Sequence, residues 1–144
     1  MNLHASKKDF INELVEYFIS QEFNVISARD ITGYNIPPLL KNDGFGDQLN
    51  RSPDVLAYDP ENNCYVIGIV RMNNNELDTE DALTEYNVFL DQFDTKTGQP
   101  YRLYILVPEE CINNLTSIIT HYIHREYWNR VIIVSSKIKI SPEC

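Results

Sequence analysis

Apolar residues recur at helical spacing near the start of the chain. Ser6-Lys7-Lys8-Asp9 is typical of a capped helix start, and the apolar stripe after it predicts a first helix that ends near Glu22. The stripe consists of Phe10, Ile11, Leu14, Val15 and Phe18. Residues 23–27 follow with a β-branched, apolar pattern, which predicts the first strand.

A β-hairpin over residues 52–71 is the centre of the predicted fold. Residues 55–58 form a short apolar run, and the turn formers at 59–63 separate it from a longer run at 65–70. The second run is apolar at almost every position. That pattern is typical of a strand in the middle of a sheet, where both faces are covered.

Two further helix and strand pairs are predicted after the hairpin. Residues 79–93 and 108–123 show apolar positions at helical spacing, and residues 101–107 and 131–134 are apolar, β-branched runs. The order is helix, strand, strand, strand, helix, strand, helix, strand. It predicts an α/β fold with a mixed sheet, whose first strands are antiparallel and whose later strands return through helices.

The two ends of the hairpin carry residues that could take part in catalysis. Pro53-Asp54 opens the hairpin and Arg71 follows its second strand. This layout resembles the PD-(D/E)XK nuclease superfamily, in which, as the resemblance implies, two strand acids bind a divalent metal and a nearby Lys helps to activate water. Asp54 matches the first acid, Arg71 stands at the Lys position, and the second acid falls at Ile69. The resemblance covers roughly residues 6–134 and implies a restriction-endonuclease-like core.

The isoleucine changes what the resemblance implies for catalysis. Mg²⁺ prefers oxygen ligands, so the loss of one of two carboxylates removes half of the protein's negative charge from the site. Arginine stays protonated and cannot share a proton with water as a desolvated lysine can, although it can hold a phosphate. We therefore expect a nuclease-like domain with a degraded metal site that is catalytically inactive and acts as a binding module.

Three glutamates could replace the missing acid. Glu13 on the first helix, and Glu80 and Glu85 on the second, lie where some members of the superfamily supply a carboxylate, although each is also explained as a solvated surface acid. The predicted catalytic residues are Asp54, Arg71, Glu13 and Glu85, and the predicted metal ligands are Asp54, Glu85 and Glu80. The alternative function is a Mg²⁺- or Mn²⁺-dependent DNA endonuclease that uses a migrated carboxylate.

A long segment at residues 29–52 is rich in turn formers. In the superfamily the corresponding segment often borders the substrate cleft. Asp43 and Asp47 lie in a glycine-containing part of it and could place a carboxylate near Asp54, but turn formation is the simpler explanation of both.

Composition favours a protein partner over nucleic acid. The 144 residues fit a single domain, and 21 acidic against 12 basic side chains give a net charge of −9. That charge repels the phosphate backbone, and the basic residues form no continuous tract, so DNA is the alternative partner through a local groove only. Nine tyrosines suit protein interfaces.

Cysteine usage and hydropathy bear on the compartment. Cys64, Cys111 and Cys144 are widely spaced and form no Cys-x-x-Cys pair, which predicts reduced thiols in a cytoplasmic protein. The chain has no signal-peptide core and no apolar run near the roughly 20 residues that a membrane span requires. No membrane partner is expected.

Overall fold

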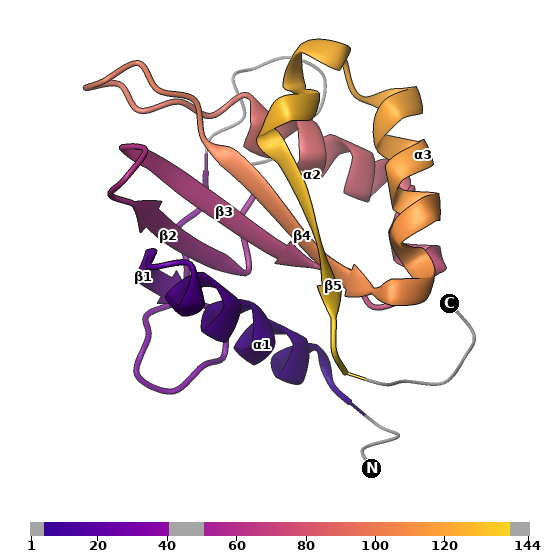
Figure 1. The fold of residues 1–144 in the computed structure, drawn as a ribbon, viewed down its shortest axis with the longest axis horizontal. Coiled ribbons are helices and arrows are strands. Elements are labelled where there is room, and N and C mark those ends of the chain that lie inside the picture. The colour runs from indigo at the N-terminus through magenta and orange to yellow at the C-terminus, as the bar shows by residue number, and fades with distance from the viewer. Residues whose placement is uncertain (1–4, 41–50, 139–144) are drawn as a thin grey trace.

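The computed structural model describes residues 5–40 and 51–138 as a five-strand mixed sheet with helices on both faces (Figure 1). The elements are α1 (Lys7–Ser20), β1 (Asn24–Ala28), β2 (Val55–Asp59), β3 (Cys64–Val70), α2 (Glu80–Leu90), β4 (Arg102–Pro108), α3 (Ile112–Tyr122) and β5 (Val131–Ser136). Three short 3₁₀ helices complete them: η1 (Asn74–Glu76), η2 (Glu109–Cys111) and η3 (Arg125–Arg130).

The strands lie in the order β1-β2-β3-β4-β5. Strand β2 is antiparallel to both β1 and β3, while β4 is parallel to β3 and β5 is parallel to β4. Each parallel step crosses over through a helix, because a parallel strand cannot be reached by a tight turn. The predicted element order and the predicted change from antiparallel to parallel pairing are therefore confirmed.

Helix α1 covers one face of the sheet. It begins with the predicted cap, since the Ser6 hydroxyl accepts from the Asp9 N–H and the Asp9 carboxylate accepts from the Ser6 N–H. The predicted stripe is buried, and it packs with Ala28, Val55, Ala57, Val66, Val70, Tyr104 and Leu106. Because the period of the stripe matches one helix face, burial of this stripe fixes α1 on the sheet.

Helices α2 and α3 cover the opposite face (Figure 1). Their buried side chains meet the alternate positions of the same strands, including Leu56, Ile67, Ile69, Leu103 and Ile105. Thus β3 is apolar on both sides because each side has its own helical layer. Ile69, which stands at the position of the second acid, is fully buried in this layer.

Element boundaries differ from prediction in several places. Helix α2 ends at Leu90 instead of continuing to Phe93, which forms an isolated bridge with Pro100. Pro108 ends β4, so the third helical segment starts with η2 instead of at the proline. The 3₁₀ helix η3 was not expected. Asp43 and Asp47 lie outside the described residues.

The described residues also bear on the cysteine and membrane predictions. Cys64 is a buried free thiol, but Cys111 is disulfide-bonded, so the prediction of a reduced thiol is wrong for Cys111. Cys144 lies outside the described residues. Within the described ranges no helix has both the length and the apolar character needed to cross a membrane.

Candidate functional site

Asp54 lies at the start of β2 with its carboxylate against the main chain of β3. The Val70 N–H donates to Asp54 Oδ2 at 3.0 Å, and the Asp54 N–H donates to the Gly68 carbonyl at 3.0 Å. One carboxylate oxygen therefore takes the place that a strand carbonyl would occupy in the β2–β3 ladder. Asp54 is only 5% exposed, so this hydrogen bond is protected from water.

The second carboxylate oxygen of Asp54 faces two cations. Lys7 Nζ lies 3.4 Å and Arg29 Nε 3.5 Å from Asp54 Oδ1. Lys7 is the first residue of α1, and Arg29 directly follows β1, so the ion group joins a helix, an edge strand and the hairpin. Arg29 also donates to the Pro53 carbonyl and the Ser52 hydroxyl, which fixes its guanidinium beside the Pro-Asp pair.

Arg71 follows β3 and points toward α2. Its main-chain N–H donates to the Leu106 carbonyl, and its Nη2 donates to Glu85 Oε1 at 2.8 Å. Its Nε donates to the Tyr86 hydroxyl at 3.3 Å, which in turn donates to the Leu77 carbonyl at 2.8 Å. These partners of the Arg71 side chain lie on α2 or in the segment that leads into it.

Burial and neighbouring groups act in opposite directions on Arg71. Burial of Arg71 works against its charge, but the interactions with Tyr86 and Glu85 outweigh that effect and raise the pKa of Arg71. Burial also raises the pKa of the Tyr86 hydroxyl, and the nearby Arg71 only partly opposes this. The pair is therefore an arginine cation beside a neutral phenol, with Glu85 as the counter-charge.

A cavity of about 290 Å³ opens beside these groups. Its lining includes Lys7 and Arg71 together with the acids Glu76, Asp81 and Glu85. Asp54 and Arg71 therefore lie at the same end of the β2–β3 hairpin, and Lys7, which contacts Asp54, borders the same cavity as Arg71. Their side chains have different partners, however: Asp54 faces two cations, while Arg71 faces one acid.

The residues at this end do not fit a divalent metal in the arrangement seen. No group of three acidic, histidine or cysteine side chains within the described residues is close enough to hold an ion. Asp54, Glu80 and Glu85 are therefore not brought together as predicted. Glu80 is exposed at the start of α2, and Glu85 is bound to Arg71. Mg²⁺ would also meet two cations at the Asp54 carboxylate.

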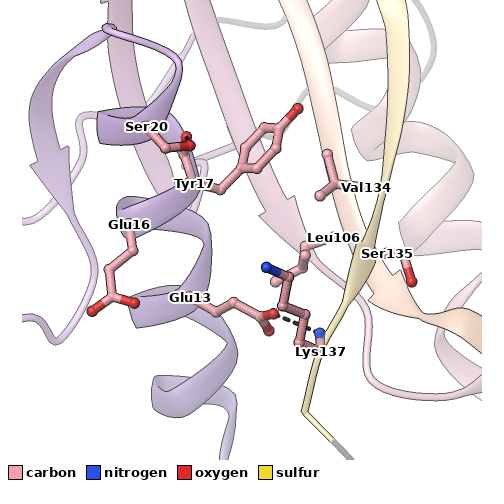
Figure 2. A pocket seen from close by; sticks show the side chains of 8 residues that line it. All are labelled: Glu13, Glu16, Tyr17, Ser20, Leu106, Val134, Ser135 and Lys137. Carbon is pink, nitrogen blue, oxygen red and sulfur yellow. Dashed lines mark hydrogen bonds between the residues drawn. The ribbon is translucent and has the colours of Figure 1, made fainter.

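Glu13 reaches the other side of α1, toward β5 (Figure 2). Its carboxylate accepts from the Ser136 hydroxyl at 2.5 Å and from the Lys137 N–H at 2.6 Å. It lies six positions after Lys7, which is about 9 Å along a helix at 1.5 Å per residue. The predicted role of Glu13 beside Asp54 is thus replaced by a link between the first helix and the end of the last strand.

Three residues of the site were not recognised from the sequence. Lys7 and Arg29 belong to the basic residues that form no continuous tract, and Tyr86 falls among the apolar positions of the helix predicted at residues 79–93. The spacing of Lys7 and Arg29 from Asp54 carries no local pattern, so nothing in the sequence marks them as its partners. Tyr86 could have been suspected, since a buried tyrosine hydroxyl needs a hydrogen-bond partner.

Comparison with known proteins returned no relative. No protein-family model matches the chain, and neither the curated proteins nor the solved structures gave a match.

Proposed function

We propose that this chain is a catalytically inactive domain with a nuclease-like core, and that it acts as a binding module for a protein partner. One observation carries the proposal: each charged residue matched to the nuclease motif is already neutralised inside the protein. Asp54 is held by Val70, Lys7 and Arg29, and Arg71 is held by Glu85.

The ion pairs oppose both steps that the nuclease chemistry requires. A metal at Asp54 would have to displace two cations, and a phosphate at Arg71 would have to displace Glu85. Arg71 and Glu85 have side chains that are only 10% and 20% exposed, so separation of the pair leaves a poorly solvated charge. We infer that the group stabilises the fold and does not turn over substrate.

One observation supports the alternative function. Helix α2 brings Glu85, a residue expected to replace the missing acid, to within 2.8 Å of Arg71. An endonuclease that uses a migrated carboxylate would need this residue. Glu85 therefore separates the two functions in an experiment.

A plasmid-nicking assay with Mg²⁺ and with Mn²⁺ tests the proposal. We expect wild-type protein, Asp54→Asn and Glu85→Gln to give the same background, because none of them presents a free metal site. The conservative amides keep the size of each side chain, and circular dichroism checks that both variants are folded. Nicking by the wild type that is lost in both variants would contradict the proposal and assign the endonuclease function.

A further inference from the structure

In the part of the chain that the structure describes, strand β5 forms an edge of the sheet without the usual protection. Within residues 5–40 and 51–138 it pairs only with β4, in a regular parallel register. Val131-Ile132-Ile133-Val134 is a continuous β-branched run with no proline or charge. Natural edge strands are usually blunted by a lysine, a proline, a bulge or a covering segment, because an open edge recruits another strand.

The opposite edge of the same sheet shows such protection. Strand β1 has an irregular register between Val25 and Ser27, where a bulge interrupts its pairing with β2. Its last N–H, that of Ala28, donates to the Asn35 carbonyl at 3.0 Å, so the following segment covers part of the outer side. The two edges are therefore treated differently, and β5 is the one left able to accept a strand.

The four apolar side chains of β5 are half-buried, two on each face of the sheet. Ile132 and Val134 pack with the α1 layer, whereas Val131 and Ile133 pack with the layer of α2 and α3. Beside β5 on the α1 face lies a cavity of about 230 Å³, with Tyr17 on its helix side and Val134 on its strand side (Figure 2). An added strand would find apolar neighbours on both faces and room on the α1 face.

We propose that β5 pairs antiparallel with β5 of a second copy of the chain, across a two-fold axis at Ile133. Such a pair would join two five-strand sheets into one continuous sheet. A two-fold axis perpendicular to the sheet leaves each side chain on the same face of the joined sheet. Because side chains alternate between the faces, two residues can lie opposite each other only if their numbers differ by an even number. Ile133 then meets Ile133 of the second copy, and Ile132 meets Val134.

Strand length and polarity select this register over its neighbours. With Ile133 on the axis, the five residues from Val131 to Ser135 are paired, and apolar side chains meet at Ile133 and between Ile132 and Val134. With position 132 on the axis, only three residues of β5 would be paired, because residues 129 and 130 belong to η3. With position 134 on the axis, both isoleucines of the strand would face serines.

The expected association is weak and depends on salt. Each copy carries a net charge of −9, so two copies repel each other at long range. Salt screens this repulsion and also favours apolar contact, so dimerisation should strengthen as the salt concentration rises. A basic partner would show the opposite salt dependence.

Sedimentation velocity of the purified chain tests the association. The wild type should pass reversibly from monomer to dimer over micromolar to near-millimolar concentrations, with more dimer at high salt. Ile133→Lys places two like charges opposite each other on the axis and should abolish the dimer, whereas Ile133→Thr keeps the β-branched shape and should retain part of it. Thermal unfolding checks that each variant is folded.

Cysteine cross-linking tests the register without relying on the lysine variant. Directly opposed residues in antiparallel strands have Cα atoms about 5 Å apart, which suits a disulfide. Ile133→Cys should therefore form a covalent dimer under mild oxidation. Val131→Cys is the matched control: it is also β-branched and on the same face, but its two copies would be offset by four residues and should not cross-link.

Three results would each overturn the proposal. They are a wild type that stays monomeric at every concentration and salt level, equal cross-linking by Ile133→Cys and Val131→Cys, and a dimer that survives Ile133→Lys. If the chain stays monomeric, the edge of β5 could pair only with a strand of a different protein. The inference does not rest on the nuclease-like core, because nicking reports on Asp54 and Glu85 while sedimentation reports on β5.

Discussion

Arg71 holds a positive charge in a position that is only 8% exposed, and Glu85 is its ionic partner. If Glu85 is changed to alanine, the guanidinium loses that partner but remains largely away from water. We expect the free energy of unfolding to fall by about 2 kcal/mol, because Glu85 is one-fifth exposed and solvent screens part of the loss. Urea unfolding followed by circular dichroism measures it.

Glu80→Ala provides the matched control for this prediction. Glu80 is an acid on the same helix, but it is exposed and forms no ion pair within the described residues. Its loss should cost only about 0.5 kcal/mol, the usual contribution of an acid near a helix start. Equal effects of the two substitutions would show that the buried pair with Arg71 contributes little.

The residue-level predictions differ in how far the sequence could support them. Glu85 is a predicted replacement for the missing acid because some members of the superfamily supply a carboxylate from this helix, but the structure pairs it with Arg71. Lys7 and Arg29 could not be found, because their approach to Asp54 depends on how α1 and β1 pack. Ion pairs between distant segments leave no periodic trace in a sequence.

Gly68 decides how closely α1 approaches the sheet. A Cβ atom there would lie 2.7 Å from Leu14 Cδ2 and 2.9 Å from two ring atoms of Phe18. Both side chains are fully buried and cannot move far, so Gly68→Ala should destabilise the fold by roughly 1 to 3 kcal/mol. Thermal unfolding measures the change.

A double-mutant cycle isolates the cause of that loss. Leu14→Ala alone should destabilise the fold by about 2 to 5 kcal/mol, because it leaves a cavity. In the Leu14→Ala background the methyl group of Gly68→Ala gains space, so the second substitution should cost less than it does in the wild type. Strict additivity would show that contact with Leu14 is not what excludes a side chain at Gly68.

Element type was predictable where the hydrophobic period was strong. The stripe of α1 and the doubly apolar β3 follow from spacing alone, because one face or two faces must be buried. The end of α2 at Leu90 and the 3₁₀ helix at Arg125–Arg130 did not follow. These boundaries depend on tertiary bonds such as those from Arg130 to the Leu90 and Tyr101 carbonyls, which join segments 40 and 29 positions apart.

The charge of the whole molecule predicts poor binding to duplex DNA. The net charge is −9, and the cations at the hairpin end, Lys7, Arg29 and Arg71, each face an acid. We expect no retarded complex in a gel-shift assay at low salt, where electrostatic binding is strongest. A complex that weakens steeply with salt, and that Arg71→Ala removes, would contradict this and indicate a local phosphate-binding groove.

The bonds of Glu13 have a consequence for the order of folding. They join α1 to Ser136 and Lys137, across 123 and 124 positions of the chain, so they close a very long loop. The entropy of closing such a loop is lost before the contact is gained, so we expect the contact to form after β5 has docked on β4. Loss of the Glu13 bonds should then speed unfolding of the completed fold and leave the rate of folding unchanged.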